Sequence, residues 1–165
     1  MFLSTPGRCM RRLGVLAAVL CAQTACAGET EDRVLDAVNR ARQAAGCPAL
    51  VVSDALTSVA YSHAKAMAEQ DFFSHTGKNG SKISNRIKAT GYRYSTAAEN
   101  IGMGYASVAE AMQGWMTSSG HRDNILNCKL TETGIAMYYQ ADDKPLPGRN
   151  FAAKYYWVEV FARPK

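Results

Sequence analysis

Hydrophobic residues in the first half of this 165-residue chain recur at spacings of three and four, which is typical of helices that pack by one face. The first such stripe predicts a helix that Thr30 caps and Gly46 ends. A second stripe predicts a helix from Ser53 and Asp54 to about Gln70. The early part of the chain is therefore expected to be helical.

His63 falls on or beside the apolar face of the second helix, so we expect a hydrogen-bonded core residue rather than a ligand. A polar, glycine-containing loop follows, and then a short helix that ends at Gly91. Ser107 and Glu110 have the spacing of a capping box, which predicts a third main helix with Trp115 on its inward stripe.

After Gly134 the period of the pattern falls to two. The segments "GIAMYYQ" and "KYYWVEVFA" are rich in β-branched and aromatic residues, and a polar, proline-containing stretch separates them. They predict two antiparallel strands joined by a long connection. Helices first and strands last indicate an α+β fold.

The first 27 residues have the three regions of a secretory signal peptide: arginines, an apolar run from Leu13 to Leu20, and an A-x-A cleavage pattern that ends at Ala27. The apolar run is too short to span a bilayer, so no transmembrane segment is expected in the mature chain. Residues 28–165 would form a single domain, secreted to the periplasm or the extracellular medium. A composition of 47% hydrophobic and 20% charged residues suits one globular domain.

Charge and cysteine content both change when the leader is removed. The leader holds three basic residues and no acidic one, so the net charge falls from +5 to +2, and no basic stripe remains to favour nucleic acid. Only Cys47 and Cys128 remain of the five cysteines, and in an oxidising compartment we expect them to pair. Such a bridge would contribute roughly 4.5 kcal/mol by loop closure. Two free buried thiols are the alternative.

Three polar segments stand out between the predicted elements, "FFSH" at 72–75, "AENIG" at 98–102 and "SSGHRDNIL" at 118–126, and we expect them in turns. If His75, Glu99 and His121 converge, they form a His2Glu site suited to zinc or another divalent cation. Their wide spacing does not establish convergence. A ligand-free polar network that ties helix, loop and sheet together is the alternative.

These segments carry a family resemblance. "VNRARQAAGCPAL", "YSHAKAMAEQDFFSHTGKNG", "GYRYSTAAENIGMG", "WMTSSGHRDNIL" and "YYWVEVFAR" resemble, in order and spacing, the bacterial branch of the CAP superfamily. That superfamily comprises cysteine-rich secretory, antigen 5 and pathogenesis-related 1 proteins, also called SCP-like extracellular proteins. The resemblance covers residues 31–163. It implies an α-β-α sandwich, with a central antiparallel sheet between helical layers and a cleft on one side.

The resemblance also implies a cleft tetrad of two His and two Glu, in which the two His can bind zinc or another divalent ion. His75, Glu99 and His121 match three members by motif, whereas Thr117 and Ser118 stand where the second Glu is usually found. The residues expected to support the cleft are Ser74, Asn100, Ser118, Arg122 and Asn124.

Glu159 is a second candidate for the missing carboxylate, because strand alternation places it on the face of Trp157 and Phe161. The favoured interpretation is a half-buried residue that makes hydrogen bonds.

Three function classes stay open. The favoured one is a secreted, monomeric binding module whose cleft takes a divalent ion or a small lipid, or which binds a cell-envelope component. The second is a hydrolase, in which a bound metal activates water or a histidine activates Ser74 or Ser118. The third is a structural or envelope-interaction protein without a ligand.

Overall fold

The computed structural model describes residues 16–165, with side chains from residue 28 onwards. Of the predicted leader, residues 1–15 lie outside the described residues, and residues 16–27 are described only as helical backbone. Across residues 16–165, no helix combines the length and the hydrophobicity that a membrane crossing requires.

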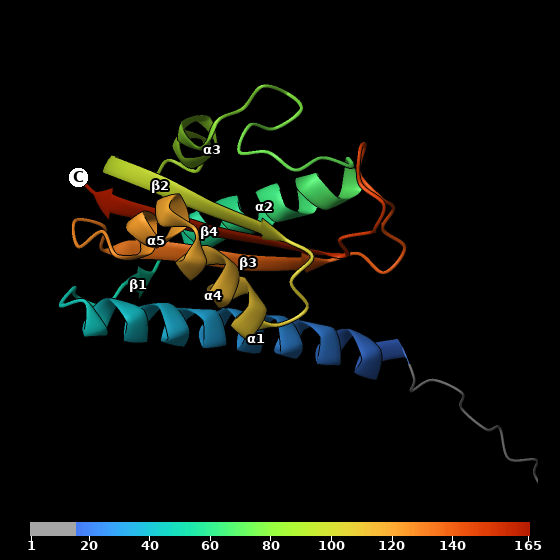
Figure 1. Ribbon diagram of the computed structural model, residues 1–165, viewed down its shortest axis with the longest axis horizontal. Helices are drawn as coiled ribbons and strands as arrows, with labels where there is room; N and C mark the ends of the chain where they lie inside the picture. The colour runs from blue at the N-terminus through green and yellow to red at the C-terminus, as the bar shows by residue number, and fades with distance from the viewer. Residues whose placement is uncertain (1–15) are drawn as a thin grey trace, which may run out of the picture.

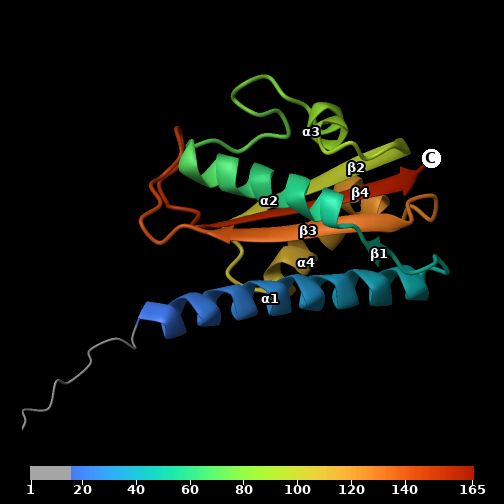
Figure 2. The ribbon, with the colours of Figure 1, turned by 180° about the vertical axis from the view of Figure 1, so that it is seen from behind.

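The described elements form three layers, with a sheet in the middle (Figures 1 and 2). Helices α2 and α3 cover one face of the sheet, and α1, α4 and α5 lie on the other. The helices are α1 (Leu16–Ala44), α2 (Asp54–Glu69), α3 (Ile83–Ala89), α4 (Val108–Thr117) and α5 (Ser119–Ile125). This arrangement confirms the α+β sandwich.

The sheet has four strands in the order β1-β3-β4-β2. The strands are β1 (Val51–Val52), β2 (Tyr94–Met103), β3 (Glu132–Tyr139) and β4 (Tyr155–Pro164). β4 pairs antiparallel with both β2 and β3, as expected for a central antiparallel sheet. The short β1 is an exception, because it pairs parallel with β3.

The placement of residues 98–102 in a turn was wrong, because they lie inside strand β2. Ala97, Ala98 and Gly102 give this segment little intrinsic strand propensity. Pairing with β4 along almost the whole strand overrides that weakness. The segment at 118–126 is likewise not a turn, since most of it forms α5.

The predicted helices have the expected faces. α2 begins after Ser53 and ends before Gln70, with its apolar stripe buried. In α4, Ser107 accepts a hydrogen bond from the Glu110 backbone at 3.2 Å, and Trp115 is 1% exposed. One detail differs: α1 continues back to Leu16, so Thr30 lies inside the helix and does not cap it.

Two apolar clusters fill the space between the layers, because successive side chains of β4 point to opposite faces. Val158 and Val160 pack towards α2, whereas Trp157 and Phe161 pack towards α1, α4 and α5. The two faces of β4 thus hold both helical layers to one strand.

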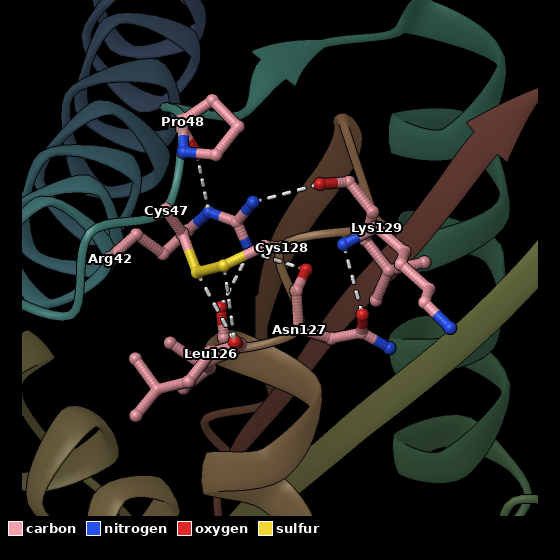
Figure 3. The surroundings of a disulfide bond; sticks show 9 residues. Arg42, Cys47, Pro48, Leu126, Asn127, Cys128 and Lys129 are labelled. Atoms are coloured by element: carbon pink, nitrogen blue, oxygen red, sulfur yellow. Dashed lines mark hydrogen bonds between the residues drawn. A yellow bond between two sulfur atoms is a disulfide. The ribbon is translucent and has the colours of Figure 1, made fainter.

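A disulfide joins Cys47, just after α1, to Cys128, just after α5, as predicted (Figure 3). Beside it lies Arg42, which is fully buried near the end of α1. Its guanidinium donates hydrogen bonds at 2.7–3.1 Å to the backbone carbonyls of Pro48, Ile125, Asn127 and Leu130. The disulfide and Arg42 therefore fix the end of α5 and the segment leading into β3 against the end of α1.

Gly134 of β3 lies directly against the backbone of α2. A Cβ on Gly134 would overlap the backbone of Leu56 and Thr57, which cannot move without shifting α2. We expect Gly134→Ala to lower the free energy of unfolding by about 3 kcal/mol or more. Chemical denaturation measures this loss.

Gly120→Ala is the matched control. A Cβ at Gly120 meets no atom within 4 Å, and the residue lies in α5, so we expect stability to be unchanged or raised by up to about 1 kcal/mol. Equal effects of the two substitutions would contradict the close packing of β3 on α2.

Candidate functional site

Glu99 lies at the centre of the candidate site, on the edge strand β2. It pairs with Val160 and therefore faces the α2 layer, where it is 7% exposed. One carboxylate oxygen, Oε1, accepts a hydrogen bond from His75 Nδ1 at 2.8 Å, and the other, Oε2, accepts one from Arg86 Nη2 at 2.7 Å. A single carboxylate thus joins β2, the loop after α2, and α3.

The carboxylate is held in its charged form. Burial by itself would raise the pKa of Glu99, but the hydrogen bond from His75 and the charge of Arg86 outweigh burial and leave the pKa below its ordinary value. An ionised carboxylate only accepts hydrogen bonds, so the proton between the two side chains belongs to Nδ1 of His75. In the neutral ring, Nε2 of His75 then keeps its lone pair.

The backbone around His75 is fixed from several sides, although the His75 side chain itself is 55% exposed. Ser74 Oγ accepts from the Thr76 N–H at 3.1 Å, and Arg86 Nη1 donates to the His75 carbonyl at 3.1 Å. His63 Nε2 donates to the Ser74 carbonyl at 3.0 Å. His63 is 2% exposed and burial lowers its pKa, which confirms the predicted core histidine.

His121 lies in the first turn of α5, on the other side of the edge strand. Its carbonyl accepts from Asn100 Nδ2 at 3.1 Å, and Asn124 donates to Asn100 Oδ1 at 2.9 Å. Within the described residues, the ring of His121 makes no hydrogen bond. Burial and then the charge of His75 lower the pKa of His121, so its ring is neutral near pH 7 and lies within electrostatic range of His75.

The expected support residues divide into two groups. Asn100 is fully buried and with Asn124 joins β2 to α5, and Ser74 shapes the loop of His75. Ser118 separates α4 from α5 and acts through its backbone, whose carbonyl accepts from the Arg122 N–H at 2.9 Å. The Arg122 side chain was expected to hold this segment, but it is exposed and makes no hydrogen bond to any described residue.

Arg86 was not among the site residues expected from the sequence. The side chain is 11% exposed, and its guanidinium contacts the Glu99 carboxylate and the carbonyls of His75 and Ser81. Burial of Glu99 on the α2 face requires a cation nearby. That requirement was not visible while residues 98–102 were placed in a turn.

The structure joins His75 to Glu99 by a hydrogen bond, whereas His121 lies in α5 and its ring bonds to neither of them. Among residues 28–165, no three His, Cys, Asp or Glu side chains form a ready metal-ligand group. Both oxygens of Glu99 already accept hydrogen bonds, from His75 and Arg86. The ring nitrogens that remain, Nε2 of His75 and those of His121, are of the type that zinc and similar cations bind.

Glu159 is fully buried rather than half-buried, and it faces the α1 layer rather than the His75 loop. Thr133 Oγ1 lies 3.0 Å from the Val160 carbonyl and 3.3 Å from Glu159 Oε1. The Thr133 hydroxyl is the donor to both oxygens, and the other carboxyl oxygen of Glu159, Oε2, is buried without a partner among the described residues. Burial raises the pKa of Glu159 to about 8, against the opposing effects of Thr133 and Arg42.

This raised pKa gives a pH-dependent prediction. Between the ordinary pKa of a glutamate and about 8, the folded protein binds more protons at Glu159 than the unfolded chain, so stability falls as pH rises through that window. Glu159→Gln removes the ionisation. We expect the free energy of unfolding of Glu159→Gln, relative to that of the parent, to rise by on the order of 1–3 kcal/mol as the pH is raised from 5 to 9.

Denaturant unfolding at a series of pH values measures this difference. Asp36→Asn is the control, because Asp36 is exposed and has no side-chain partner among the described residues. A Glu159→Gln variant whose stability runs parallel to that of the parent at all pH values would contradict a neutral Glu159.

A three-layer sandwich whose edge strand carries a Glu99 bonded to His75 is the arrangement of an SCP-type domain, and the comparison with family models agrees. The model of the cysteine-rich secretory protein family, CAP, matches residues 35–161, and the chain belongs to this family.

Similar proteins come from several bacteria. The chain is 32% identical over 105 residues to the "Uncharacterized protein YkwD" of Bacillus subtilis (strain 168), which covers 64% of this chain and 41% of YkwD. An outer surface protein of Borrelia burgdorferi superposes with a TM-score of 0.73 at 18% identity, over 83% of this chain and 94% of that one. An extracellular protein containing an SCP domain from Bacillus anthracis superposes with a TM-score of 0.69 at 24% identity, over 83% and 41%. These two structures support the fold.

The chain spans less than half the length of YkwD and less than a third of the "Uncharacterized membrane protein YlbC" of the same organism, to which it is 31% identical. The matched region is therefore the domain that these longer proteins share with this chain.

Proposed function

We propose that this protein is an exported binding module whose cleft takes a divalent cation such as zinc between the imidazoles of His75 and His121. Export is supported by the signal-like leader of residues 1–27 and by the extracellular and outer-surface relatives.

The observation that carries the cation proposal is the hydrogen-bonded chain from Arg86 to Glu99 to His75. A carboxylate that accepts from the distal ring nitrogen of a histidine orients the ring and raises its basicity as a ligand. In this site Glu99 does so at 2.8 Å, which leaves Nε2 of His75 available. A bound cation would supply charge and open coordination positions for a partner's oxygen atoms.

His121 suits the second ligand position. A metal ligand must be neutral, and the lowered pKa of His121 keeps its ring neutral to a lower pH than that of an ordinary histidine. Asn100 and Asn124 hold its backbone, so the ring is carried on a fixed segment. The serine form of the hydrolase alternative needs a serine hydroxyl bonded to an imidazole, and no described serine side chain hydrogen-bonds to the His75 or His121 ring.

Calorimetric zinc titration of the metal-stripped protein tests the proposal. We expect about one equivalent to bind, with affinity falling as pH drops below about 6.5, because protonated imidazoles do not coordinate. His75→Ala and His121→Ala should each abolish most of the affinity, and the double variant should be little worse than either one. Glu99→Gln should weaken binding by about 10- to 100-fold, since Glu99 acts through His75.

Arg122→Ala is the matched control, because Arg122 neighbours His121 but its side chain is exposed and bonds to no described residue. It should bind zinc as the parent does. A parent protein that takes up no divalent ion, combined with His75 and His121 variants of reduced stability, would show that the cluster is a structural polar network.

A further inference from the structure

A cavity lies on the α2 side of the sheet, on the face opposite α5 and His121. It has a volume of about 460 Å³ and is lined by residues of α2, of the loop that follows it, and of α3. Figure 2 shows these three segments on the same side of the sheet. This volume falls within the range of roughly 300–1,000 Å³ that small-molecule sites occupy. His75, Glu99 and His121 do not line it, so the cavity is separate from the proposed cation site.

The charge of the cavity wall has one sign. Lys78 and Arg86 line it, and no Asp or Glu of the described chain does so. Arg86 forms one wall, and its Nε–H is buried without a partner among the described residues. The charge of Arg86 is paired with Glu99, so Lys78 is the cation that this acid-free wall offers to an anionic ligand.

The amide side chains add further donors. Asn79 Oδ1 accepts from the Ser81 N–H at 3.0 Å, and Asn85 Oδ1 accepts from the Lys82 N–H at 3.0 Å. These bonds fix the orientation of both amides and engage their oxygen atoms. The NH2 groups of Asn79 and Asn85 have no partner among the described residues, so both remain available as donors.

The rest of the wall suits hydroxyl groups and a carbon ring. His63 donates from Nε2 to the Ser74 carbonyl, and its lowered pKa keeps it neutral, so its Nδ1 is an acceptor. Phe72 provides an apolar surface, and two serine hydroxyls and a further amide complete the polar lining. A bare inorganic anion would contact Lys78 but leave most of this volume and these groups without contacts.

We propose that this cavity binds an acidic saccharide unit, a pyranose that carries a carboxylate. Lys78 and the asparagine NH2 groups would meet the carboxylate, and the neutral side chains and Phe72 would meet the hydroxyls and the ring. The site does not depend on the cation between His75 and His121, so either proposal can fail without the other.

Backbone amide NMR with added sodium glucuronate tests this assignment, with glucose and inorganic phosphate as comparison probes. We expect glucuronate to shift the amides of residues 77–81 and of α3, and to bind roughly tenfold more tightly than glucose or phosphate. Lys78→Glu should weaken glucuronate binding by about tenfold or more, because Lys78 is exposed and its loss leaves the fold intact.

Lys129→Glu is the matched control, since Lys129 is exposed beyond α5, outside the cavity, and has the same change in charge. It should bind glucuronate as the parent does. The assignment is overturned if glucuronate shifts no amide in this region, if glucose or phosphate binds equally well, or if both lysine variants lose binding alike. Retained binding in the His75→Ala, His121→Ala double variant would support the independence of the two sites.

Discussion

The candidate site depends on one buried carboxylate, Glu99, at the edge of the sheet. Removing a carboxylate from water is unfavourable unless cations and hydrogen-bond donors replace the lost solvation. His75 and Arg86 replace it at 2.8 and 2.7 Å. This requirement holds the loop after α2 and the helix α3 against β2, and so it fixes both the exposed histidine and one wall of the neighbouring cavity.

Glu99 and Asn100 are consecutive residues of a strand and therefore point to opposite faces. Glu99 binds the segments of the α2 layer, whereas Asn100 binds the backbone of His121 and the side chain of Asn124 in the α5 layer. Two adjacent residues of the edge strand thus hold the segments that carry His75 and His121. Pairing of β2 with β4 sets their register, and a slip by one residue would exchange their faces.

The buried Arg42 and the disulfide perform a related task at the far end of α5. Arg42 donates to the backbone carbonyls of Ile125, Asn127 and Leu130, at the end of α5 and in the following turn. α5 carries His121, and the two ends of this helix are held by different contacts. Asn100 holds the start, and Arg42 and the Cys47–Cys128 disulfide hold the segment after the end. The ring of His121 is consequently presented by a segment with little freedom to move.

Local patterns in the sequence were sufficient for the features that depend on nearby residues. The stripe of α2 predicted its ends and the burial of His63, and the cysteine count predicted the bridge. Strand β2 was missed because its partner lies about 60 residues further along the chain and supplies the stability that its own composition lacks.

Arg86 was missed for a similar reason, because its significance comes from a carboxylate 13 residues away on a different element. Arg122 was assigned a role from its place in the motif, but its side chain points to solvent. The positions of the motifs therefore predicted the residues of the candidate site. Which side chains fix those residues in place became clear only from the packing.

The central prediction for the His75 ring is that Glu99 fixes its proton on Nδ1 and leaves Nε2 for a cation. Long-range nitrogen–proton NMR of the imidazoles, before and after addition of zinc, tests this directly. We expect a neutral His75 ring protonated at Nδ1, and zinc-dependent shifts of the signals of Nε2 of His75 and of a ring nitrogen of His121. A His75 ring protonated at Nε2 in the neutral form, or imidazole signals that zinc leaves unchanged, would contradict it.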